Sequence, residues 1–106
     1  MEDKKRIYET QKNMLRYIGD MYQRSRREID CCQFDSVMPA GLANDRQLVY
    51  LIDRALEDCS NDTKLIIRND FLKKSEPQWY RNYYNATTYY RRRRRAVEEF
   101  MHCLNI

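Results

Sequence analysis

The chain has 106 residues, 34% of them charged, and a formal net charge of +4. Its length allows one small domain. Two glycines, two prolines and the lack of alternating apolar and polar runs predict an all-α protein with a modest core. No apolar run approaches the roughly 20 residues of a membrane span, and no apolar segment follows the charged N-terminus. We therefore expect a cytoplasmic protein without a membrane span or a secretory signal.

The sequence has none of the patterns on which common active sites are built. It contains a single histidine, His102, and lacks a glycine-rich phosphate loop, a nucleophile motif and a metal-binding spacing of Cys or His. We therefore expect neither an enzyme nor a bound cofactor or metal ion. The cysteines are expected to be reduced thiols in or near the core, and they are Cys31, Cys32, Cys59 and Cys103.

Residues 1–33 predict one long amphipathic helix, or two helices that break near Gly19. The apolar positions that recur every seven residues are Tyr8, Leu15, Tyr22 and Ile29. Because this stripe is too apolar to stay in water, we expect the helix to fold back on the second and third helices. The alternatives are a homodimer formed through this helix and docking on a large partner.

Residues 34–44 read as a linker, and residues 45–106 as a helical domain. Within that domain, apolar residues at helical spacing predict a second helix from about 44 to 58 and a third from about 61 to 74. With the elements that follow, the prediction is a four- or five-helix all-α domain.

Positive charge is concentrated in one segment of the chain. Residues 63–95 contain ten basic and two acidic residues, a net charge of +8, which leaves −4 for the rest of the chain. A basic segment beside an acidic one is typical of a nucleic-acid-binding module with a separate part that faces proteins.

Residues 75–104 predict a helix-turn-helix. Ser75 and Gln78 have the spacing of a capping box, and a short aromatic helix over 77–84 should follow. After a turn at Asn85, a longer helix begins. Its first free backbone N–H groups can be capped by the side chains of Asn85, Thr87 and Thr88.

Counted at 100° per residue, this last helix has an apolar seam and an arginine-rich outer face. The seam consists of Tyr89, Ala96, Val97, Phe100, Cys103 and Leu104. The outer face consists of Thr87, Tyr90, Arg91, Arg94 and Arg95. Arg93 falls near the seam and Arg92 on its flank. Since a buried unpaired guanidinium is costly, these two must either extend to solvent or pair with an acid from another helix.

The segment from Tyr84 to Phe100 reads Tyr-Asn-Ala-Thr-Thr-Tyr-Tyr-Arg-Arg-Arg-Arg-Arg-Ala-Val-Glu-Glu-Phe. It resembles the C-terminal helix-turn-helix of sigma-70 region 4, and more closely the small sigma-region-4-like phage regulators of the ArpU type. Small mycoplasmal proteins have a similar tail. The likeness covers about residues 60–104 and is specific over the last twenty. It departs at Asn85, where the pattern has Ser, and at Arg92, where the pattern has an apolar residue.

The resemblance implies that the first two turns of the last helix enter the major groove, which places Ala86, Thr87 and Tyr90 there with Arg91 close by. We therefore expect a double-stranded DNA-binding transcription regulator or sigma-like factor. The expected base-facing residues are Thr87, Thr88, Tyr90 and Arg91. The expected phosphate-binding residues are Lys73, Lys74, Arg81, Arg92, Arg94 and Arg95. The alternatives are an adaptor that docks on RNA polymerase and a module that binds structured RNA.

Overall fold

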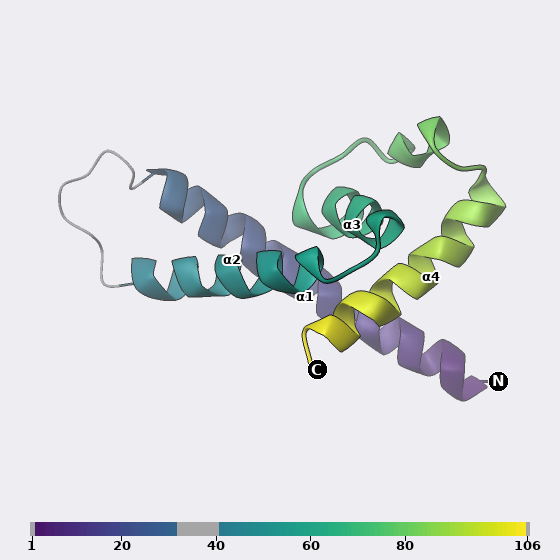
Figure 1. Ribbon diagram of the computed structural model, residues 1–106, viewed down its shortest axis with the longest axis horizontal. Helices are drawn as coiled ribbons and strands as arrows, with labels where there is room; N and C mark the ends of the chain where they lie inside the picture. Colours follow the sequence, from purple (N-terminus) through teal and green to yellow (C-terminus); the bar gives the residue numbers. More distant parts are fainter. Residues whose placement is uncertain (1, 32–40, 106) are drawn as a thin grey trace.

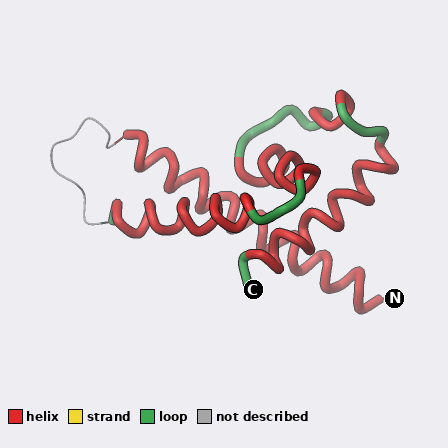
Figure 2. Tube along the Cα trace, viewed as in Figure 1, coloured by secondary structure: helices red, strands yellow, loops and turns green. Residues whose placement is uncertain are grey.

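The computed structural model describes residues 2–31 and 41–105, and in these ranges it is helical without a strand. This confirms the all-α prediction. The α-helices are α1 (Glu2–Cys31), α2 (Leu42–Glu57), α3 (Asn61–Ile67) and α4 (Ala86–Cys103). The short turns are the π-helical η1 (Arg68–Leu72), which continues α3, and the 3₁₀ turn η2 (Trp79–Asn82). Figures 1 and 2 show α1 and α2 running side by side as an arm, with α4 crossing the N-terminal half of α1.

α1 is one continuous helix, so the alternative of a break near Gly19 is wrong. It packs on α2, η1 and α4, which confirms that the long helix folds back on the rest of the chain. Leu15 is completely buried in the common core, and Tyr8 and Tyr22 pack against that core. The predicted end of this helix at residue 33 lies outside the described residues.

The core draws on all four α-helices. Its wholly buried side chains include Leu15, Ile52, Leu56, Ile66, Val97 and Phe100. The predicted seam of α4 is confirmed, since its residues are buried or half-buried there. α2 begins at Leu42, slightly earlier than predicted, so the last residues of the predicted linker are helical.

The thiols differ in their exposure. Cys59 is buried and Cys103 is half-buried, as predicted, whereas Cys31 is exposed and Cys32 lies outside the described residues. Burial and the neighbouring Cys103 thiol raise the pKa of Cys59. Cys59 therefore stays a protonated, unreactive thiol at neutral pH.

A close contact between α1 and η1 fixes the position of the third helix. A Cβ atom on Gly19 would lie 2.2 Å from the carbonyl oxygen of Phe71, so only glycine allows this approach. The same oxygen accepts a hydrogen bond from Gln23 Nε2 at 3.1 Å. π-helical turns are wider than α-helical ones and are frequent at functional sites. Here the turn ends the third helix at Leu72, two residues before the predicted end.

Two polar contacts join the arm formed by α1 and α2. The buried Ser25 hydroxyl donates to Asp45 Oδ1 at 2.9 Å, and the Tyr22 hydroxyl donates to Asp53 Oδ1 at 2.7 Å. Burial and this hydrogen bond raise the pKa of Tyr22 to about 12. Buried polar groups cost little when they are paired in this way, so the arm tolerates them inside its seam.

The predicted aromatic helix over 77–84 is wrong. The structure has only the four-residue turn η2 in that region, and Ser75 Oγ donates to Asn69 Oδ1 at 2.9 Å instead of capping a helix. Tertiary contacts override the local signal, because the rings of η2 pack back on α4. The most extensive contacts of α4 are with α3 and then with α1, and those with α2 and η2 are smaller. The helix immediately ahead of the last one in the predicted helix-turn-helix is thus a single 3₁₀ turn.

Candidate nucleic-acid interface

The start of α4 is capped and exposed. Asn85 Oδ1 accepts a hydrogen bond from the backbone N–H of Thr88 at 2.8 Å, so Asn85 fills the predicted capping role. Ala86 and Thr87 are exposed, Thr88 is half-buried, and 58% of Tyr90 is accessible. The first turns of this helix therefore project from the fold and are available to a partner.

An aromatic platform, formed by Trp79, Tyr80 and Tyr89, supports this projection. The rings of Tyr80 and Tyr89 are stacked, with centroids 3.9 Å apart and planes within 3°. Trp79 meets the edge of Tyr89 at 5.9 Å and 89°. Aromatic pairs in such geometries stabilise by about 0.5–1.5 kcal/mol beyond the area that they bury. The platform therefore holds η2 against the first turn of α4.

Asp70 of η1 joins the platform to the arginine run. Its carboxylate accepts hydrogen bonds from Trp79 Nε1 at 2.8 Å and from the Tyr89 hydroxyl at 2.5 Å. Arg93 Nε lies 3.2 Å from Asp70 Oδ2, and its guanidinium lies 5.5 Å from the centroid of the Phe71 ring. Burial, followed by the hydrogen bond to Asp70, raises the pKa of Tyr89 above its ordinary value. Arg93 thus pairs with an acid from another helix, which was one of the two predicted solutions.

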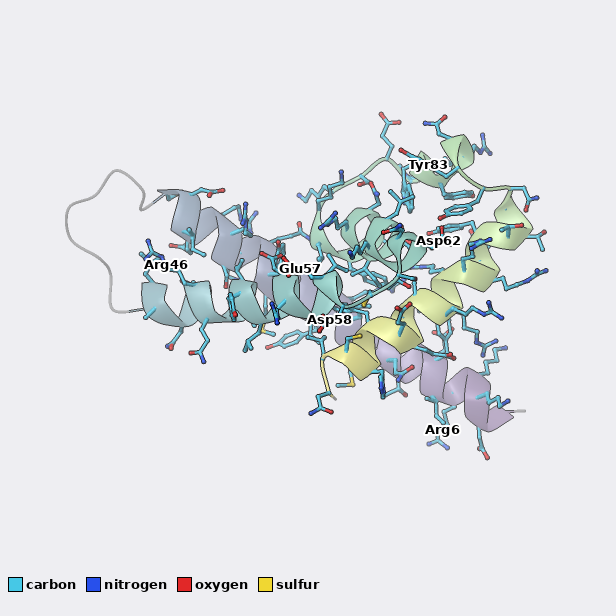
Figure 3. All side chains as sticks on the ribbon, viewed as in Figure 1. Arg6, Arg46, Glu57, Asp58, Asp62 and Tyr83 are labelled. Atoms are coloured by element: carbon cyan, nitrogen blue, oxygen red, sulfur yellow. The ribbon has the colours of Figure 1, made fainter. Side chains whose placement is uncertain are left out.

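Asp62 of α3 pairs with Arg92, as Asp70 pairs with Arg93. It accepts a hydrogen bond from the Tyr84 hydroxyl at 2.5 Å and forms an ion pair with the Arg92 guanidinium. That guanidinium also lies 5.5 Å from the centroid of the Tyr84 ring. Figure 3 shows Asp62 between α3 and α4. Burial and the Asp62 hydrogen bond raise the pKa of Tyr84 to about 12. Arg92, expected to bind phosphate, is therefore held by a carboxylate of the protein itself.

The five arginines are thus divided by their partners. Arg92 and Arg93 pair with carboxylates of the third helix. Arg91, Arg94 and Arg95 are exposed, and none of them forms an ion pair with a residue that the structure describes. Three guanidinium groups consequently stay available to an external anion, all on the outer face of α4.

These three arginines share a cleft with the N-terminal end of α1. This α1–α4 cleft has a volume of about 850 Å³ and is also lined by Lys4, Lys5, Tyr8, Glu9, Tyr90 and Glu98. The Arg94 guanidinium lies 5.1 Å from the centroid of the Tyr8 ring. Five cations therefore face two carboxylates, one of which, Glu9, already pairs with Lys12 at 2.9 Å. The cleft attracts polyanions, as concave basic surfaces do.

Sequence reasoning missed Lys4 and Lys5 as members of the site. The basic start of the chain was visible, but α1 brings it to α4 only through tertiary packing. Among the predicted phosphate-binding residues, Lys73 and Lys74 lie elsewhere, in a cleft between the second half of α1 and the end of η1. Arg81 is exposed on η2.

No family model, curated protein or solved structure matches this chain. Within residues 2–31 and 41–105, no helix is both long and apolar enough to cross a bilayer. The same residues hold no group of three His, Cys, Asp or Glu side chains placed to bind a metal ion.

Proposed function

We propose that this protein is a double-stranded DNA-binding transcription regulator or sigma-like factor that places the first turns of α4 in the major groove. The observation that carries the proposal is the division of the arginine run. Arg92 and Arg93 are held by internal carboxylates, whereas three other arginines face a cleft to which a second helix adds two lysines. Cations without internal partners in a concave surface favour a polyanionic ligand.

The exposed first turns of α4 suit the reading of bases. The major groove of B-DNA is about 12 Å wide and admits an α-helix. Thr87 and Tyr90 project from the capped end, and Arg91 follows them on the same outer face. An arginine in this position can donate two hydrogen bonds to guanine, and threonine can donate to or accept from several bases. These residues are the proposed readers.

The cations around α4 are suited to binding phosphates. Arg94 and Arg95 of α4 and Lys4 and Lys5 of α1 line opposite sides of the α1–α4 cleft. Phosphate contacts of this kind fix the register of a protein on the duplex without reading its sequence. Asp62, Asp70 and the aromatic platform hold α4 and its inner arginines in place before binding, which reduces the entropy lost on association.

The proposal is tested by fluorescence anisotropy with labelled duplex DNA and with duplex RNA of the same sequence, over a range of salt concentrations. We expect DNA affinity to fall steeply with salt. Replacing Arg94 and Arg95 by Ala should flatten the log–log slope by about one unit per lost contact. Arg24→Ala with Arg46→Ala is the matched control, because both side chains are exposed and neither lines the α1–α4 cleft.

Specificity provides a separate test. Thr87→Ala or Tyr90→Ala should weaken binding to preferred sequences by about 1–3 kcal/mol per good base contact, with a smaller loss on other sequences. Equal losses on all sequences would show that these residues are not readers. Stronger binding to RNA would instead favour a structured-RNA module. Binding to purified RNA polymerase without binding to either nucleic acid would favour the adaptor function.

A further inference from the structure

A second basic cleft lies between the C-terminal half of α1 and the end of η1. This α1–η1 cleft has a volume of about 490 Å³, and its cationic lining residues are Arg26, Arg27, Arg68, Lys73 and Lys74. Of the described residues that line it, none is acidic. None of the five cations forms an ion pair with another residue in the described part of the chain. The α1–η1 cleft thus combines five cations with no carboxylate in its own lining, whereas the α1–α4 cleft combines five cations with two carboxylates. Lys73 and Lys74 also line a neighbouring cleft with Asp20, Asp70 and Glu76. A concave surface with this excess of positive charge attracts anions.

The two clefts face the same side of α1. Residues 4, 5, 8 and 9 of α1 line the α1–α4 cleft, and residues 22, 23, 26 and 27 line the α1–η1 cleft. Each residue of the second set is 18 positions after its counterpart in the first, and 18 positions correspond to five turns of about 3.6 residues. The two sets therefore point in the same direction from the helix axis, about 27 Å apart along it.

This spacing suits one long polyanion better than two separate ligands. About eight base pairs of duplex, at about 3.4 Å each, span 27 Å. A nucleic-acid duplex carries phosphates along its whole length, so it can occupy both clefts at once. Two small anions would not require the clefts to be aligned on one helix.

We propose that the α1–η1 cleft is a second site for the phosphate backbone, and that a duplex engaged by α4 continues along α1 and is held there by Arg26, Arg27, Arg68, Lys73 and Lys74. This inference rests on the proposed function, because α4 supplies the first contact. α1 then fixes the distance between the two phosphate-binding clefts. The ligand is double-stranded DNA that extends beyond the segment read by α4.

The test compares the length dependence of binding by the full chain. Anisotropy is measured with a DNA hairpin whose stem has about 5 base pairs, about 17 Å and so too short to reach from one cleft to the other, and with a duplex of about 20 base pairs. The variants are Arg27→Gln with Lys74→Gln in the α1–η1 cleft, and Arg94→Gln with Arg95→Gln in the α1–α4 cleft. All four side chains are exposed, so circular dichroism should show unchanged folding.

The matched control is Arg24→Gln with Arg46→Gln, which removes the same charge outside both clefts. Figure 3 shows Arg46 on the end of the arm that is distant from α4. We expect the α1–η1 variant to bind the short stem as the control does. On the long duplex, it should lose affinity and flatten the salt slope by about two units, one for each lost contact. The α1–α4 variant should weaken binding to both lengths.

Three results would overturn the inference. If the α1–η1 variant equals the control on the long duplex, the second site is wrong while the proposed function of α4 still stands. If the wild-type chain binds neither duplex in a salt-dependent way, the proposed function and the inference fail together. If only binding of an acidic polypeptide such as polyglutamate depends on Arg27 and Lys74, the cleft is a protein-docking site instead.

Discussion

Replacing Gly19 by Ala should destabilise the protein, although glycine inside a helix is normally the less stable choice. In an open helix this change would stabilise by about 1 kcal/mol through helix propensity. Here the new Cβ would lie 2.2 Å from the Phe71 carbonyl oxygen and 3.0 Å from its carbonyl carbon. Since Cβ atoms essentially never approach closer than 3.0 Å, α1 and η1 would have to separate by roughly 0.8 Å or more.

The free-energy cost of that separation decides whether Gly19→Ala stabilises or destabilises the protein. Overpacking of this kind costs typically about 1–3 kcal/mol. Weakening the hydrogen bond from Gln23 Nε2 to the same oxygen adds about 1 kcal/mol. Against the gain in propensity, we expect a net loss of about 1–3 kcal/mol in the free energy of unfolding. Urea denaturation followed by circular dichroism measures it.

Gly41→Ala is the internal control for this prediction. A Cβ atom on Gly41 meets nothing within 4 Å, and its φ of −83° is accessible to alanine. We expect a change within about 0.5 kcal/mol. If Gly19→Ala proves as stable as the wild type, or more stable, then the close contact between α1 and η1 does not exist and the placement of η1 is wrong.

Leu15→Asp should abolish the cooperative thermal transition, because it places an unpaired charge at a wholly buried position. If the variant is instead a folded monomer with unchanged melting temperature, α1 serves dimerisation and not the folding of the monomer. Asp70→Asn should cost about 3–5 kcal/mol in urea denaturation, since it leaves a largely buried guanidinium without its partner. Burial raises the pKa of Glu99, but hydrogen bonds from Thr63 and Ser60 outweigh it and leave that pKa below 4.5. The stabilisation is thus present above pH 4.5 and lost as pH falls through the lowered pKa, so Glu99→Gln should lower Tm at neutral pH and converge with the wild type in acid.

Most of the helices could be predicted from the sequence, because helix formation leaves a periodic apolar pattern in the residues themselves. The seam of α4, its Asn85 cap and its exposed arginine face all follow from positions within a few turns of each other. The prediction of a helix over 77–84 was wrong because Ser75 and Pro77 resemble a helix start locally. In the folded protein, Trp79 and Tyr80 are stabilised more by packing on Tyr89 than by a regular helix.

The sequence by itself determined which residues are cationic and which face of α4 carries them. Only the tertiary structure decided which cations keep an internal partner. Arg92 and Arg93 meet carboxylates 30 and 23 positions away, and no periodicity within one helix encodes that pairing. The lysines at the start of α1 and the arginines near its end likewise reach their clefts through helix crossings. Those crossings depend on how closely two backbones can approach, as at Gly19, and that is a property of the assembled core.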